Sequence, residues 1–132
     1  MKFTIIPVVF FLVLGCAIAE GPRQKLDRGV FQFHEGLRWG RHSDVLPVVD
    51  EQAREHFEKM HAGWGTDIQI SSADVIQMVY DDKNRKAVVN VRFSWFRKRE
   101  MDAYETVTRQ NWEYRTGKWW LVAEEYLSGQ PF

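Results

Sequence analysis

The chain has 132 residues with 18 basic and 18 acidic side chains, so its formal net charge at neutral pH is zero and shows no basic surplus for nucleic acid. Hydrophobic residues make up 45% and aromatic residues 14%, which excludes a disordered chain and allows one compact domain. The single cysteine, Cys16, excludes an intrachain disulfide, so packing alone must hold the fold.

An apolar leader begins the sequence. Lys2 is followed by a nearly uncharged run over residues 3–14, which has the layout of a secretory signal. This run is too short to cross a bilayer as a helix, which needs about 20 apolar residues. We therefore expect the protein to be exported.

Two cleavage sites remain open. Val13-Leu14-Gly15 before Cys16 resembles the lipobox of bacterial lipoproteins, although the leucine departs from the small residue usual at its position. This resemblance implies a signal peptide over residues 1–15 and acyl chains such as palmitate on Cys16, which would tether the protein to the cell-envelope membrane. In the bacterial lipoproteins that it resembles, an alanine after the cysteine implies the periplasmic face of the outer membrane. The alternative is ordinary cleavage after Ala19, which would leave a soluble protein.

Residues 16–27 are polar and contain glycine and proline, which indicates a tether. The helical spacing of apolar residues then predicts three helical stretches, over residues 27–40, 43–49 and 50–61. Gly40 ends the first stretch and Pro47 limits the regularity of the second.

Past Thr66 the apolar residues alternate, which predicts four strands, over residues 68–80, 86–96, 101–115 and 118–126. Helices followed by a strand meander predict an α+β fold, with the helices on one face of an antiparallel sheet. We expect this domain over residues 28–126 and a polar tail over residues 127–132.

The tight turn at Thr116-Gly117 predicts the pairing of the last two strands. It places Trp112 opposite Leu121, and Arg109 opposite Glu124. One face of the sheet then collects apolar and aromatic side chains and should meet the helices. Its pocket candidates are Trp95, Tyr104, Thr106, Thr108 and Gln110.

The opposite face mixes valines and aromatic rings with charged residues, and is more apolar than a fully solvated face. Two interpretations remain open: a partner surface or homodimer interface, and a partly covered outer face with ordinary salt bridges. The candidate partner residues are Arg92, Arg109, Trp120, Glu124 and Tyr126.

The segment from His34 to Asp44, continued by Val49 to Arg54, resembles the helix-turn-helix opening of NTF2-like (cystatin-like α+β) domains. The closing strands, Asn111 to Val122, are similar to the final hairpin of that family. The resemblance covers about residues 28–126 and implies a cone, in which a strongly curved sheet wraps around a long helix and often dimerises. It implies no single activity, because the fold hosts enzymes, ligand binders and structural modules.

Signs of catalysis are few. In NTF2-like isomerases and dehydratases, polar side chains move protons inside the cone, and the candidates here are Asp74 and Tyr104. His56 and His61 lie about 140° apart around a helix, which argues against a shared metal ion. No glycine-rich phosphate motif follows a strand, and we expect no cofactor.

The sequence therefore predicts a membrane-tethered, non-enzymatic binding module of the cell envelope. Its partner would be a second copy, another envelope protein or a small apolar ligand in the cone. The alternatives are a small exported isomerase- or dehydratase-like enzyme with a pocket in the cone, and a soluble periplasmic ligand binder. An open cavity that joins Asp74 to Tyr104 would favour the enzyme, whereas a cone filled by Trp95, Trp112 and Trp119 would exclude it.

Overall fold

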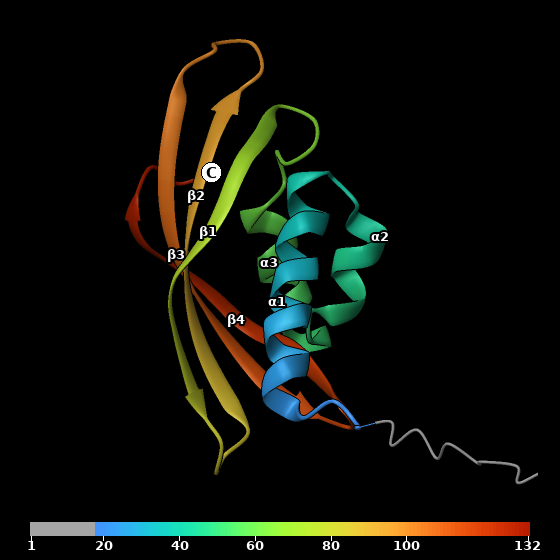
Figure 1. Cartoon of the computed structure of the whole chain (residues 1–132). Helices are drawn as coiled ribbons and strands as arrows, with labels where there is room; N and C mark the ends of the chain where they lie inside the picture. Colours follow the sequence, from blue (N-terminus) through green and yellow to red (C-terminus); the bar gives the residue numbers. More distant parts are fainter. Residues whose placement is uncertain (1–17) are drawn as a thin grey trace, which may run out of the picture.

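The computed structural model describes residues 18–132, so the leader and the lipidation candidate Cys16 lie outside the described residues. Helices come first and strands follow (Figure 1). The elements in order are α1 (Pro22–Arg38), α2 (His42–Val45), η1 (Leu46–Val48), η2 (Glu51–Ala53), α3 (Arg54–Met60), β1 (Ile68–Asp81), β2 (Lys86–Arg97), β3 (Ala103–Arg115) and β4 (Lys118–Gly129).

Helix α1 begins at Pro22, five residues before the expected start, so the prediction of a tether through residue 27 is wrong for its last part. Pro22 occupies the first turn, where a missing N–H removes no helical hydrogen bond and the fixed backbone angle suits the helix. The added turn contributes Leu26, which is fully buried and continues the apolar stripe of Val30, Phe33 and Leu37.

The four strands form one antiparallel sheet in the order β1-β2-β3-β4, with each strand joined to the next by a hairpin. The long strands bend along their length, and the helices lie together on one side of the sheet (Figure 1). The predicted α+β class, with N-terminal helices on a curved antiparallel sheet, is confirmed. Among residues 18–132, none of the helices combines the length and apolar character that a membrane crossing needs.

The side of the sheet that faces the helices, called here the inner face, forms the core. It carries the buried tryptophans Trp95, Trp112 and Trp119, as predicted. Trp112 meets Phe33 of α1 edge to face, with ring centroids 5.2 Å apart. The backbone of Asp50 donates a hydrogen bond to the carbonyl of Leu121, which fastens the second half of the helical layer to β4.

Two bulges in β4 change the predicted strand pairing. From the tight turn to Trp112 opposite Leu121, the strands pair as predicted. Val122 is then an extra residue in β4 that has no partner in β3, so Asn111 lies opposite Ala123. Because one inserted residue reverses which face the following side chains occupy, Glu124 lies opposite Gln110 on the inner face. The predicted pairing of Arg109 with Glu124 is wrong, and Glu125 takes that place.

The chain end returns to the core instead of remaining a polar tail. Strand β4 continues to Gly129, and the backbone N–H of Gln130 then donates to the carbonyl of Glu105. The Phe132 ring packs edge to face on Trp64, with ring centroids 4.6 Å apart. The domain therefore extends beyond the expected boundary at residue 126.

Candidate functional site

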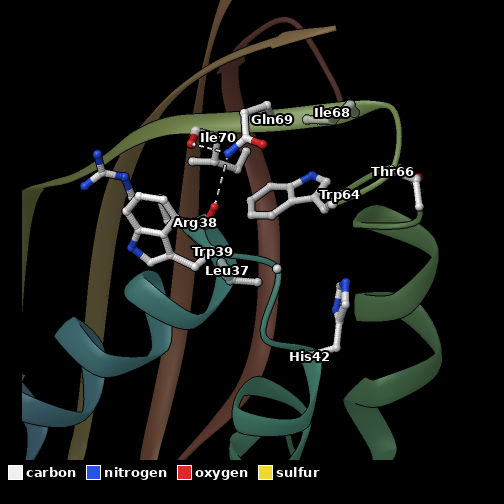
Figure 2. Close-up of a pocket in the computed structure, with 11 residues that line it drawn as sticks. Leu37, Arg38, Trp39, His42, Trp64, Thr66, Ile68, Gln69 and Ile70 are labelled. Carbon is white, nitrogen blue, oxygen red and sulfur yellow. Dashed lines mark hydrogen bonds between the residues drawn. The ribbon is translucent and has the colours of Figure 1, made fainter. Parts of the chain in front are cut away.

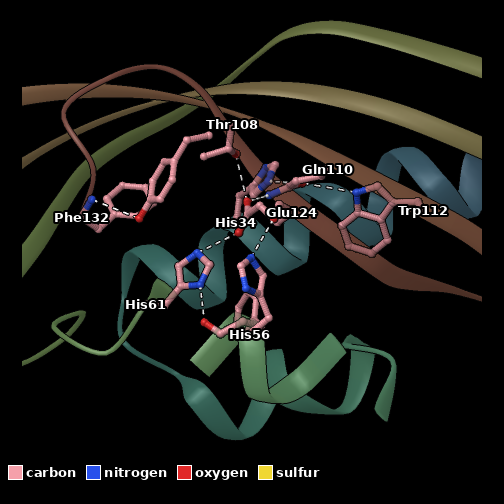
Figure 3. Close-up of polar contacts among 10 residues, drawn as sticks. His34, His56, His61, Thr108, Gln110, Trp112, Glu124 and Phe132 are labelled. Atoms are coloured by element: carbon pink, nitrogen blue, oxygen red, sulfur yellow. Dashed lines mark hydrogen bonds and ion pairs between the residues drawn. The ribbon is translucent and has the colours of Figure 1, made fainter. Parts of the chain in front are cut away.

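Five buried polar side chains meet on the inner face and form what is called here the polar cluster (Figure 3). They come from four parts of the chain: α1, the residue after α3, β3 and β4. The members are His34, His61, Thr108, Gln110 and Glu124. A group this polar persists in a core only when its donors and acceptors are paired.

The carboxylate of Glu124 is the centre of the cluster. Its Oε2 accepts hydrogen bonds from Thr108 Oγ1 at 2.9 Å and from Gln110 Nε2 at 2.8 Å. Its Oε1 lies 2.9 Å from Nε2 of His61, and both side chains are almost completely buried. Every oxygen of this carboxylate therefore has a polar neighbour.

Hydrogen-bond geometry fixes the number of protons on this pair. The Nδ1 of His61 lies 2.8 Å from the carbonyl oxygen of Phe57, which can only accept, so Nδ1 bears a proton. The Nε2 of His61 and the Oε1 of Glu124 have only each other as polar partners among the described residues. One proton must therefore lie between them, because two lone pairs would otherwise face each other.

The direction of the Glu124 pKa shift shows that its surroundings favour the charged form of the carboxyl group. Burial raises this pKa, but the charge of His61 and hydrogen bonds from His61, Gln110 and Thr108 outweigh burial, so the pKa lies below its usual value. Glu124 is therefore best described as a carboxylate that is held in its charged form by three donors.

Gln110 links the carboxylate to His34. Because its amide nitrogen donates to Glu124, its Oε1 must accept, and it lies 3.1 Å from His34 Nε2 and 3.3 Å from Trp112 Nε1. His34 is therefore the tautomer with a proton on Nε2. Burial lowers the pKa of His34, and its hydrogen bond to Gln110 and the charge of Glu124 only partly oppose this.

Aromatic rings close the cluster on the side of the chain end. Phe132 lies 5.6 Å from the ring of His61 and 5.6 Å from the ring of Tyr126. The Tyr126 hydroxyl accepts the backbone N–H of Phe132, and burial raises the pKa of Tyr126. Thr106 donates to the carbonyl of Gln130. The polar cluster is thus enclosed by rings as well as paired.

The predicted pocket residues do come together on the inner face. Trp95 stacks on Tyr104 with ring centroids 4.6 Å apart and donates to Thr106 at 2.8 Å. Thr108 and Gln110 belong to the polar cluster and are fully buried. These side chains bind one another and the cluster, as parts of a packed core.

The predicted catalytic pair is not formed. Asp74 is exposed and lies opposite Arg92 in the ladder, because extra residues in β1 shift its register. Tyr104 lies opposite Trp95 and its hydroxyl donates to Glu100 at 3.3 Å. The two candidates occupy different positions along the sheet and share no hydrogen bond, so the prediction that both face inward is wrong for Asp74.

Three of the five predicted partner residues lie on the outer face, the side of the sheet away from the helices. Arg92 pairs with Glu105 at 3.2 Å and Arg109 with Glu125 at 3.5 Å. The ring of Trp120 lies 3.7 Å below the ammonium of Lys118. Glu124 and Tyr126 are corrections, because the β4 bulges place Glu124 in the polar cluster and Tyr126 beside Phe132.

His34 and His61 were not recognised as interior residues from the sequence. A signal was nevertheless present in Thr108 and Gln110, whose predicted inward position requires polar partners in the core. The side chains of His, Cys, Asp and Glu within residues 18–132 form no group of three or more that could hold a metal ion.

No protein-family model and no curated protein sequence matches this chain. Among solved structures, a proposed Ca/calmodulin-dependent kinase II association domain from Exiguobacterium sibiricum is similar, with a TM-score of 0.65 and 15% identity, over 82% of this chain and 93% of that one. A SEC-C motif containing protein from Rhodopseudomonas palustris has a TM-score of 0.59 and 11% identity, over 81% and 79% of the two chains. At these identities the likeness shows the α+β fold alone.

Proposed function

We propose that this chain is an exported, non-enzymatic binding module with an NTF2-like domain, tethered to the cell envelope through a lipid on Cys16. It acts by pairing its outer face with a second copy of itself. The fold, the state of the polar cluster and the charge pattern of the outer face each support one part of this proposal.

The observation that carries the proposal is that the acid–base pair of the polar cluster, His61 and Glu124, is already engaged within the protein. Both oxygens of Glu124 and both ring nitrogens of His61 already have polar partners within the protein. A general acid or base needs a position within hydrogen-bond reach of a substrate. This acid–base pair therefore supports a structural role for the interior and binding elsewhere.

The outer face has the charge pattern of a self-complementary surface. Arg92 and Arg109 alternate with Glu105 and Glu125 over β2, β3 and β4. A two-fold dimer brings the same patch of both copies together, so a patch with both signs can pair each charge with its opposite. The half-buried side chain of Val107 lies between these charges and adds apolar area. The description of the first structural neighbour as an association domain supports the same role.

The experiment that tests self-association compares two charge reversals in the full chain. Arg109→Glu breaks the pair with Glu125 and should shift sedimentation from dimer towards monomer. Arg99→Glu, at an exposed position of the β2–β3 turn, changes the net charge equally and should leave the dimer intact. A wild-type chain that sediments as a monomer, or an Arg109→Glu chain that dimerises like wild type, would overturn the proposal.

The tether has a separate test. The full chain expressed in a bacterium should be recovered from membranes as an acylated species that begins at Cys16, and the Cys16→Ser variant should lose both the lipid and the membrane association. A soluble species that begins at Glu20 would contradict the lipid anchor and leave the outer-face proposal standing.

A further inference from the structure

A groove of about 330 Å³ lies between α1 and β1, the strand at one edge of the sheet, and is called here the α1–β1 groove. Two contacts fasten the helix to the strand beyond its ends. At one end, the side-chain amide of Gln69 donates to the carbonyl of Arg38, as Figure 2 shows. At the other end, the guanidinium of Arg23 lies 5.8 Å from the centre of the Tyr80 ring. The groove is therefore a bounded space between a helix and a strand that are held together on both sides of it.

Apolar side chains from both elements line the α1–β1 groove. On α1, Asp27, Phe31 and His34 follow one another at intervals of four and three residues, so they lie on the same flank of the helix. Val75 and Met78 line the groove from β1. Phe31 is 65% exposed and Val75 is 44% exposed, so apolar surface faces water here. Apolar surface of this kind, bordered by polar residues, is typical of a groove that binds a ligand.

A buried histidine presents an unpaired acceptor to this groove. His34 is only 5% exposed and lines the groove. Its Nε2 bears the proton that is donated to Gln110, so its Nδ1 has a lone pair, and burial keeps the ring neutral by lowering its pKa. Nδ1 has no hydrogen-bond partner among residues 18–132 and is not one of the fully enclosed atoms that lack a partner, so it is open to the groove. Because buried acceptors are nearly always paired, this nitrogen is suited to a ligand that brings a donor.

The charged side chains of the groove favour a cation. Among the described residues, those that line it include no lysine or arginine but three carboxylates, on Asp27, Glu35 and Asp74. Glu35 already accepts a hydrogen bond from Trp39 at 3.1 Å. Asp27 has no ion-pair or hydrogen-bond partner within residues 18–132, and the adjacent Arg28 pairs with Glu20 at 2.6 Å instead. The carboxylate of Asp27 is therefore available to a positively charged ligand.

The spacing of the two available groups limits the shape of that ligand. Seven residues separate Asp27 from His34, which places them about 10 Å apart along the helix axis. Apolar side chains, including those of Phe31 and Met78, line the groove as well. A matching ligand therefore has an amino group at each end and an apolar chain between them.

We propose that the α1–β1 groove binds a linear aliphatic diamine. One amino group donates to Nδ1 of His34, and the ammonium at the other end pairs with Asp27, because hydrogen bonds between ionised groups are the stronger ones. The methylene chain lies on Phe31, Val75 and Met78, where it removes apolar surface from water. This binding activity is independent of the proposed self-association, since the paired charges of the outer face do not line the groove.

The direct test follows the ring resonance of His34 by NMR while the full chain is titrated with cadaverine, a five-carbon diamine, at constant neutral pH. This resonance, assigned by its loss in His34→Gln, should shift in a saturable way. The resonance of the exposed His42 should stay in place, which excludes a change in pH as the cause. An unmoved His34 resonance at high cadaverine concentration would overturn the proposal.

Two further probes with the same carbon chain separate the contributions of charge and length. Pentylamine has one amino group and should bind at least about tenfold more weakly than cadaverine, because it cannot engage His34 and Asp27 together. Glutarate has a carboxylate at each end and should leave the His34 resonance unmoved. Equal affinity for pentylamine would overturn the role of the second amino group, and an equal response to glutarate would overturn the preference for a cation.

Matched charge removals give a second readout. Asp27→Asn should weaken cadaverine binding at least about tenfold, because the ionised partner of one ammonium is lost. Asp102→Asn removes the same charge before β3 and should bind cadaverine like wild type. Both aspartates are exposed, so both variants should fold. Equal cadaverine affinity in Asp27→Asn and wild type would overturn the placement of the diamine in this groove.

Discussion

Glu124 and His61 face each other at 2.9 Å inside the core, and the hydrogen bond from His61 to the Phe57 carbonyl leaves one proton between them. The pair joins the residue after α3 to the middle of β4, close to the bulge at Val122 that brings Glu124 to the inner face. It therefore fixes the helical layer to the sheet at one defined position. A buried ion pair adds little net stability compared with apolar side chains of similar volume, but removal of one partner leaves a buried charge and is costly.

The two partners should respond differently to substitution. Glu124→Gln keeps the shape of the cluster, because the new amide can donate to a neutral His61 and still accept from Thr108 and Gln110. We expect it to cost at most about 1–2 kcal/mol. His61→Leu leaves the Glu124 charge buried without its partner and should cost about 3–5 kcal/mol. Urea unfolding of the three chains measures both values.

A comparable loss in both variants would contradict the proton count given for this pair. Acid unfolding provides the control. Because the pKa of Glu124 is lower in the folded chain than its ordinary value of 4.5, its contribution is present above that pH and is lost as the pH falls towards the folded pKa. Glu124→Gln should reduce the loss of stability in this acid range.

His34 predicts a second pH dependence, at higher pH. Its pKa in the folded chain is lowered from 6.5, so the unfolded chain takes up a proton first as the pH falls. Its contribution to stability is therefore complete above pH 6.5 and declines as the pH drops below it. His34→Gln, which can still donate to Gln110, should lose less in melting temperature between pH 7.5 and 5.5 than wild type, on the order of a few degrees.

The matched control for this experiment is His42→Gln, because His42 is exposed. It should retain the pH dependence of the wild-type chain. If His34→Gln and His42→Gln melt with the same dependence on pH, then burial of His34 is not the source of the effect.

The order of helices and strands and the inward-facing residues of β2 and β3 could be predicted from the sequence, because alternating apolar residues and turn residues are local patterns. Trp95 and Trp112 are therefore found where alternation puts them. The bulge at Val122 has no such signal, since Glu124 and Glu125 are adjacent, identical residues and only the tertiary structure decides which is buried. Because of this one extra residue, the predicted pairing of Arg109 with Glu124 was wrong, and Glu124 lies opposite Gln110.

The start of α1 at Pro22 and the packing of Phe132 in the core were not predicted, because both depend on contacts with distant parts of the chain. Gly21-Pro22 is a breaker pair in isolation, but proline in a first turn is also a helix start, and burial of Leu26 favours the helix. Phe132 follows Gly129, Gln130 and Pro131, which read as a polar loop. Its packing against Trp64 depends on a partner far away in the sequence.

Trp112 tests the assignment of the inner face. Its ring is 1% exposed, meets Phe33 edge to face and donates to Gln110. Trp112→Ala should lower the free energy of unfolding by about 3–5 kcal/mol. Trp120→Ala, in the neighbouring strand and half-buried on the outer face, should cost about 1 kcal/mol. Guanidinium unfolding of both variants measures the difference, and similar losses would contradict the face assignment.

Gly129 tests how the returning segment is held. Its φ is +83°, and a Cβ there would collide with the carbonyl oxygen of Glu105, the same oxygen that accepts the backbone N–H of Gln130. Gly129→Ala should therefore add a displacement of residues 130–132 to the left-handed backbone cost of about 1–2 kcal/mol. Phe132 would then leave Trp64, and the near-ultraviolet circular dichroism of the tryptophans should weaken.

Gly117→Ala is the matched control, because φ is +80° and an added Cβ meets nothing within 4 Å. It should show the backbone cost with an unchanged aromatic signal, whereas the same loss of signal in both variants would mean that backbone strain alone, and not the close approach to Glu105, explains the effect.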